Sequence, residues 1–343
     1  MLRPQLSGNE REGLAKVGTK DAEAYQLYLK GRYHASKATA DGLKKGIEYF
    51  QQAIEKDPGD ALAYAGLADC YIDLGGVMGY LPQSEIFPKA KAAANRALQI
   101  DDTLAEAHAA FGSIKEFYEW DWAGAEREFK RAIALNPNSA DAHNRYGGYL
   151  MSMGRFDEGL TETIRAQELD PLSPLVAGGL GYNYMVAHRY DDSIEQCKKA
   201  IELDPNAMWL HAILAWAYAR KGMHSQAITE YEKMGPERYA VSAENQLIAS
   251  GLGWVYAIAG RRKDAVRIID DFNTLSSGAH VDPYLVAVIY AGLRDKDRAF
   301  ELLEKSYREH GGIMVYLTED PFWEDLRSDP RYADLLRRIR LPH

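Results

Sequence analysis

Three histidines occupy equivalent places in a recurring pattern of this chain and have the clearest potential for metal chemistry. His108, His143 and His211 each lie four residues before an alanine or glycine of that pattern. Imidazole binds zinc at about 2 Å, whereas the packed helices that would carry the three rings lie about 8–10 Å apart. We therefore interpret the rings as half-buried substitutes for core aromatic residues, and we expect neither a metal nor another cofactor.

Other reactive residue types lack the neighbours that catalysis requires. The carboxylate pairs Asp191–Asp192 and Asp270–Asp271 fall at turns or helix ends, without a base or nucleophile nearby. Cys70 and Cys197 are isolated, with no cysteine or histidine at metal-ligand spacing. Because the sequence shows no acid–base dyad and no nucleophile motif, we predict that the chain is not an enzyme.

Composition and charge exclude further classes of function. The 343 residues are 46% hydrophobic and 27% charged, which is enough apolar material for a folded core. The net charge of −9 disfavours direct nucleic-acid binding, because phosphate contacts need clustered Lys and Arg. Apolar stretches are shorter than the roughly 20 residues of a membrane span, and residues 1–20 are polar, unlike a secretory signal. We expect a cytoplasmic protein whose partner is a protein or peptide, and we leave its oligomeric state open.

The pattern that contains the histidines is a ladder of small residues with a period near 34. Its members recur at intervals of 44, 35, 34, 34, 38 and 34 residues: Ala68, Gly112, Gly147, Gly181, Ala215, Gly253 and Ala287. A repeat of this length is typical of a solenoid of helix pairs. Within residues 141–171, one helical stripe of apolar residues ends at Gly154 and a second ends at Pro171. The small residue lets the two helices of a pair cross closely.

The residues around the small positions match the pattern W-x2-L-G-x2-Y, followed by A-x3-F and then P. Five of the units carry it as Tyr64-Leu67-Ala68-Tyr71, Leu180-Gly181-Tyr184, Leu214-Ala215-Tyr218, Leu252-Gly253-Tyr256 and Val286-Ala287-Tyr290. The chain therefore resembles the tetratricopeptide repeat family. This resemblance implies an all-α solenoid, a right-handed superhelix of about eight helix-turn-helix repeats, whose first helices line a concave surface.

The repeat signal covers only part of the chain. We expect a leader or linker over residues 1–21, the repeat array over residues 22–310 and capping helices over residues 311–343. A last repeat needs a helix across its exposed face. Trp323 and Leu336 are the candidates for that contact.

Two departures from the period predict longer connections. The turn-forming residues 75–88 predict a loop between the helices of one unit, and residues 234–238 predict a separation of the sixth and seventh units. At a third corner, Asp121 is placed to cap a helix, with Trp120 and Trp122 bracing the turn.

Some phrases are narrower than the general repeat pattern, namely Ala24–Tyr33, Tyr118–Trp122 and Asp329–Tyr332. They resemble the C-terminal repeat region of bacterial multidomain signalling proteins, in which a winged-helix regulator, adenylate cyclase or Ser/Thr kinase domain lies upstream. The resemblance leaves two alternatives. The chain is a protein–protein interaction scaffold that binds a protein or peptide in its groove, or it is the regulatory segment of a signalling protein whose effector domain lies elsewhere.

The repeat frame also predicts a peptide-binding groove. In this family the residue after the small position points inward, and three such residues are the aromatic Tyr182, Trp216 and Trp254. The full set of groove candidates is Asn144, Arg145, Met151, Tyr182, Met185, Trp209, Trp216 and Trp254. Aromatic anchors dominate many interfaces, so we predict that they hold an apolar or extended peptide, which Asn144 and Arg145 orient. Replacing Trp216 and Trp254 by alanine should then weaken binding with little change in melting temperature. The alternative is that the rings fill the inter-repeat core or pack on a cap.

Overall fold

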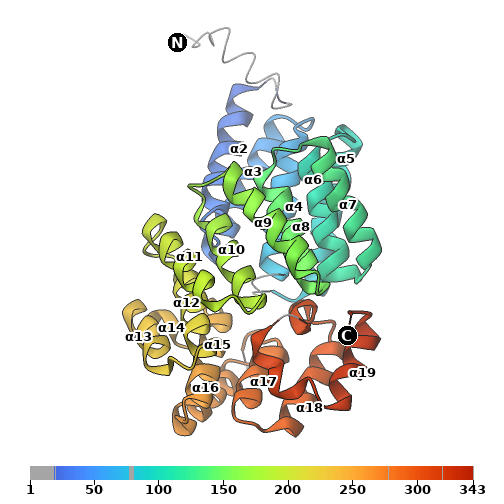
Figure 1. Ribbon diagram of the computed structural model, residues 1–343. Coiled ribbons are helices and arrows are strands. Elements are labelled where there is room, and N and C mark those ends of the chain that lie inside the picture. The colour runs from blue at the N-terminus through green and yellow to red at the C-terminus, as the bar shows by residue number, and fades with distance from the viewer. Residues whose placement is uncertain (1–18, 20, 77–80, 277, 319, 343) are drawn as a thin grey trace.

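The computed structural model describes residues 19, 21–76, 81–276, 278–318 and 320–342, and the described residues form helices joined by turns (Figure 1). They contain eight antiparallel helix pairs: α2 (Ala22–Ala35) with α3 (Ala40–Lys56), α4 (Ala61–Gly75) with α5 (Gln83–Ile100), α6 (Ala105–Ile114) with α7 (Trp122–Leu135), α8 (Ala140–Ser152) with α9 (Phe156–Leu169), α10 (Pro174–Val186) with α11 (Tyr190–Leu203), α12 (Met208–Arg220) with α13 (His224–Met234), α15 (Gln246–Ile258) with α16 (Arg262–Leu275), and α17 (Pro283–Gly292) with α18 (Lys296–Arg308). The pairs wind into the right-handed α-solenoid that the repeat pattern predicts.

Small residues and polar caps explain why each pair forms. Ala68, Ala215 and Ala287 have no exposed surface at all, so the helices touch at the ladder positions. Ser139 accepts a hydrogen bond from the backbone nitrogen of Ala142 at 3.2 Å and so caps α8. Asp121 caps α7 in the same way through the backbone nitrogen of Gly124, at 2.9 Å.

Both connections that were predicted as longer than usual contain helix in the structure. Of the residues 75–88, numbers 77–80 lie outside the described part, but α5 already begins at Gln83 and contains Pro88. The prediction of a loop up to residue 88 is therefore wrong, because Ile86 and Phe87 are buried and their packing outweighs the cost of an internal proline. Between the sixth and seventh pairs, the connection contains the short helix α14 (Pro236–Tyr239).

After α18 the chain forms a C-terminal segment that packs on the last repeat, where Arg331 and Arg338 pair with Asp297 and Glu304 of α18, and that also reaches the third repeat (Figure 1). It forms the 3-10 helices η2 (Gly312–Leu317) and η3 (Pro321–Leu326) and then α19 (Pro330–Ile339). His310 lies 2.6 Å from the backbone oxygen of Tyr118 and stacks on Trp120, with ring centroids 4.0 Å apart. Trp122 donates its indole N–H to the backbone oxygen of Ile339 at 2.9 Å. The end of the chain is thus attached to the third repeat, about 200 residues earlier in sequence.

The core includes this C-terminal segment. One apolar cluster runs from α10 to the C-terminal helices, and a second occupies the first repeats. Val315 of η2 has no exposed surface and belongs to the second cluster, together with Ile72, Ile114 and Phe117. The C-terminal segment therefore joins the two halves of the solenoid. Within the described residues, no helix is both long and apolar enough to cross a lipid bilayer.

Candidate functional site

The inner helices α10, α12, α15 and α17 form a surface that we call the concave wall. It faces residues 320–324, which we call the resident segment. The wall rings Trp216 and Trp254 are 5% and 3% exposed, and both contact Phe322 of the resident segment edge-on, with centroids 5.4 Å and 5.0 Å away. Edge-to-face pairs of this kind stabilise contacts beyond the area that they bury. The two tryptophans thus make an aromatic site for a third ring.

A buried carboxylate next to Phe322 is held by hydroxyl groups of the wall. Tyr182 donates its hydroxyl to Asp320 at 2.7 Å, and the hydroxyl of Tyr284 donates to the other oxygen of the same carboxylate. Burial raises the pKa of Asp320 to about 6, although the two tyrosine hydrogen bonds oppose that rise. Trp323 closes the arrangement, because its indole N–H donates to the Tyr284 hydroxyl at 2.8 Å.

Arg220 supplies the cation of the wall. Its guanidinium donates to the backbone oxygen of Pro321 at 3.3 Å and forms an ion pair with Glu324. The sequence reasoning missed this residue, although Arg220 follows Trp216 by four residues and so shares its helix face. Asp320 and Phe322 carried no comparable signal, since no repeat period extends to the segment after α18.

The remaining groove candidates lie in different surroundings. Met151 and Met185 are 0% and 1% exposed and lie in the cores between helices, not at the groove surface. Trp209 is half-buried and lies over Gly178 of the preceding inner helix. Asn144 is half-buried on α8, beside Gly179 of α10. Because Trp216 and Trp254 are buried, their replacement by alanine is now expected to lower the melting temperature as well. Peptide binding by the set stays a prediction.

Arg145 lies on the inner side of the N-terminal half, among carboxylates. Its side chain is 17% exposed and pairs with Asp69 at 3.1 Å and Asp141 at 2.8 Å. Burial raises the pKa of Asp69 to about 7 and that of Asp73 to about 6, although Arg145 lowers both. Glu116, only 4% exposed, has its pKa raised by burial to about 8, against the effect of Arg145 and a hydrogen bond from Ser152. One cation therefore serves several carboxylates.

This carboxylate group predicts how stability depends on pH. Each raised pKa means that the folded chain holds a proton that the unfolded chain releases above pH ~4, so the free energy of unfolding should fall as pH rises from 5 to 8. We expect a loss of at least about 2 kcal/mol over that window, measured by urea unfolding. Glu116→Gln should flatten the profile. A wild-type profile that is flat or rises between pH 5 and 8 would contradict the expectation.

The three equivalent histidines form the same polar tie in each repeat. In His108, His143 and His211, one ring nitrogen lies 2.8, 2.5 and 3.1 Å from Glu128, Glu162 and Glu230 of the paired helix. The other nitrogen faces a backbone oxygen of the preceding turn at 3.1–3.4 Å. The rings therefore join helix to helix through hydrogen bonds, where apolar packing was expected. No group of three or more metal-binding side chains occurs among the described residues.

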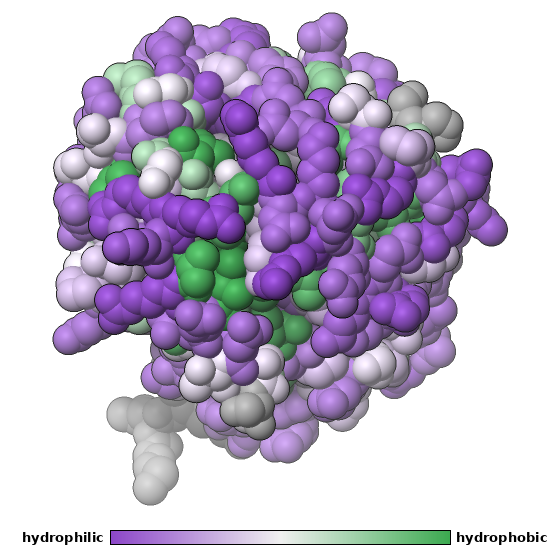
Figure 2. Space-filling model, turned by 90° about the horizontal axis from the view of Figure 1, so that it is seen from below, coloured by the Kyte–Doolittle hydropathy of each residue, from purple (hydrophilic) through white to green (hydrophobic). Residues whose placement is uncertain are grey.

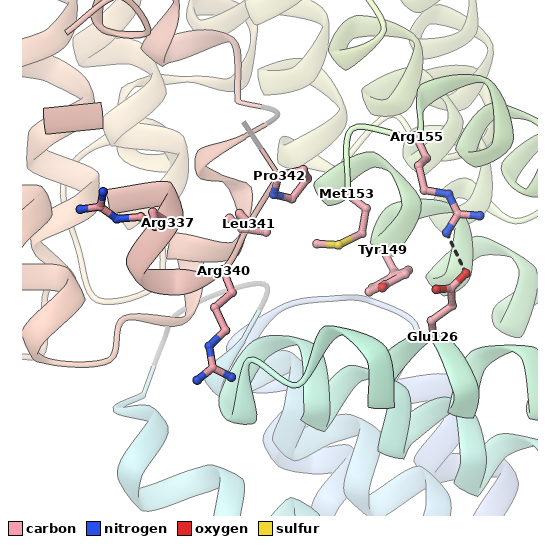
Figure 3. Close-up of a pocket in the computed structure, with 8 residues that line it drawn as sticks. All are labelled: Glu126, Tyr149, Met153, Arg155, Arg337, Arg340, Leu341 and Pro342. Atoms are coloured by element: carbon pink, nitrogen blue, oxygen red, sulfur yellow. Dashed lines mark hydrogen bonds and ion pairs between the residues drawn. The ribbon is translucent and has the colours of Figure 1, made fainter. Parts of the chain in front are cut away.

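A surface pocket of about 480 Å³ lies where the chain end meets the third and fourth repeats (Figure 3). Tyr149 and Met153 face Leu341 and Pro342 across it, whereas Arg337 and Arg340 extend away from these apolar residues. A second pocket of about 260 Å³ lies between α16 and α18. The underside of the molecule shows apolar side chains gathered between polar ones (Figure 2).

Comparisons with known proteins agree with this geometry. A model of the tetratricopeptide repeat matches residues 117–174. The crystal structure of the APC/C hetero-tetramer Cut9–Hcn1 matches the fold with a TM-score of 0.64 at 15% identity, covering 96% of this chain and 58% of that one. The described repeats therefore have the tetratricopeptide repeat fold, and residues 117–174 match that family in sequence. The human IFIT1 dimer with m7Gppp-AAAA has the same fold, with a TM-score of 0.55 at 15% identity over 78% of this chain and 68% of that one.

Two curated proteins are similar in sequence to parts of this chain. The type IV pilus assembly protein PilF of Pseudomonas aeruginosa is 34% identical over 106 residues, which is 31% of this chain and 40% of PilF. The transcriptional regulator HilA of Salmonella typhimurium is 27% identical over 149 residues, which is 43% of this chain and 27% of HilA. The matches thus span less than half of either relative. Proteins with this repeat fold are generally non-enzymatic scaffolds.

Proposed function

We propose that this chain is a non-enzymatic scaffold that binds a protein or peptide on its concave side. The observation that carries the proposal is the resident segment, since the wall already holds a stretch of polypeptide through side chains suited to that purpose. Trp216 and Trp254 bind a ring, Tyr182 binds a carboxylate, and Arg220 binds a backbone oxygen. Interfaces of proteins are enriched in the same residue types.

Affinity capture with matched variants tests this function. The wall variant Trp216→Ala with Trp254→Ala should lose a partner that the wild type retains. Phe129→Ala with Phe300→Ala is the control, because those rings are equally buried, at 0% and 2% exposure, but lie in outer helices. Both variants are compared below their melting temperatures. A partner retained by the wall variant as well as by the control would contradict the proposal.

A second candidate function is regulation within a larger signalling protein. The similarity to HilA supports it, because that relative is a transcriptional regulator of which this chain spans 27%. In that case the repeats would sense a partner in the cytoplasm and act on an effector domain. A kinase, cyclase or winged-helix domain encoded in frame before Met1 would favour this second function.

A further inference from the structure

The concave wall and the resident segment match each other group by group. The segment reads Asp320-Pro-Phe-Trp-Glu324. Tyr182 and Tyr284 take its first carboxylate, Trp216 and Trp254 take its first ring, and Arg220 takes the proline carbonyl and the last carboxylate. These contacts define a recognition sequence of a carboxylate, a proline and two aromatic residues.

The resident segment depends on the wall for its conformation. It belongs to η3, a 3-10 helix of six residues, and short helices of this type have few and poorly aligned internal hydrogen bonds. Its last residue, Glu324, has half of its side-chain surface exposed, so a competing chain can approach from that edge.

We propose that the concave wall is a docking site for a partner segment with this acidic–Pro–aromatic–aromatic chemistry, and that residues 320–324 occupy the site until the partner displaces them. The inference rests on the proposed scaffold function and names its partner chemistry. Arg220 and the two tyrosine hydroxyls favour an acidic sequence, whereas a basic or purely apolar segment would leave these donors unpaired in a buried site. The occupant is a partner protein of this chemistry, and a dimer in which two copies of the chain exchange the segment is the outcome that overturns the proposal.

Competition within the chain sets the affinity that a partner shows. A tethered segment acts at an effective concentration in the millimolar range. The apparent affinity for an added peptide is reduced by the fraction of chains in which the wall is free. A substitution that weakens only the resident segment should therefore tighten binding of the same sequence added from outside.

Peptide titration against full-length variants tests the proposal. The probe is a fluorescent, N-acetylated peptide of residues 320–329, and anisotropy reports its binding. Glu324→Lys repels Arg220 while replacing a half-exposed side chain, so folding is preserved. Glu304→Lys is the matched control, because Glu304 is also a surface glutamate paired with an arginine, Arg338, but lies on α18 away from the wall. Circular dichroism checks that both variants are folded.

We expect Glu324→Lys to bind the peptide at least about 10-fold more tightly than the wild type does, and Glu304→Lys to bind it like the wild type. A peptide carrying Phe322→Ala should bind the Glu324→Lys chain at least about 10-fold more weakly. Adding Tyr182→Phe to that chain should also weaken binding. The proposal would be overturned if Glu324→Lys and Glu304→Lys bound the peptide with equal affinity. It would also be overturned if the Phe322→Ala peptide bound the Glu324→Lys chain as tightly as the unaltered peptide does.

Light scattering tests whether a second copy of the chain is the occupant instead. If Glu324→Lys forms dimers that exchange their C-terminal segments and does not bind the peptide, the occupant is a second copy and the proposal is overturned. The affinity-capture experiment tests the scaffold function separately from this partner chemistry. A partner captured through the wall by a chain that does not bind the peptide would leave the scaffold function intact and remove only this partner chemistry.

Discussion

Replacing Trp323 by alanine should lower the free energy of unfolding by about 3–5 kcal/mol, the range for a fully buried tryptophan. Trp323 has no exposed surface, and its ring packs edge-on against Tyr284 with centroids 4.9 Å apart. The substitution leaves a cavity between η3 and α17 and removes the hydrogen bond to the Tyr284 hydroxyl. Urea unfolding followed by circular dichroism measures the loss.

A control for Trp323→Ala is Leu172→Ala, which removes a large apolar side chain that is 75% exposed. Its expected effect is within about 0.5 kcal/mol. Faster cleavage of the C-terminal segment by trypsin should accompany the loss in Trp323→Ala, because Arg327 and the residues after it would separate from the repeats more often. A loss below about 1 kcal/mol would mean that the indole does not fill the space between η3 and α17.

Adjacent glycines of α8 should respond to the same substitution in opposite directions. A methyl group at position 147 would lie 3.0 Å from the backbone oxygen of Gly159 and would also meet Thr163, whereas one at position 148 would meet nothing within 4 Å. Gly147→Ala should therefore cost about 2 kcal/mol through overpacking. Gly148→Ala should gain up to about 1 kcal/mol from the better helix propensity of alanine.

The comparison of these two variants isolates the close crossing of α8 and α9, since both change the same helix by one methyl group. The measured quantity is the difference between their free energies of unfolding, expected near 3 kcal/mol. If the two variants were equally stable, close helix crossing would not be the reason for the small residues of the ladder.

The repeat period was sufficient to predict most of the fold. The ladder from Ala68 to Ala287 predicted the helix pairs, their stacking and the inner side of each first helix, because every unit packs only on its neighbours and local spacing then determines long-range structure. The same frame placed Tyr182, Trp216 and Trp254 on the concave side, where the structure has them facing Asp320 and Phe322. It failed for residues 83–88, where the burial of Phe87 decides the local structure.

The sequence by itself therefore determined the class of the protein, an α-solenoid without recognisable catalytic or metal-binding motifs, and the face on which to look for a site. Only the tertiary structure decided what fills that face. The sequence of the C-terminal residues 309–318 and 320–342 has no period, and one of their contacts, Trp122 with Ile339, joins residues 217 positions apart. Such pairings depend on the curvature that eight stacked repeats accumulate, which no local pattern encodes. For the same reason, Arg220 and Glu324 could be matched only once the superhelix had brought them together.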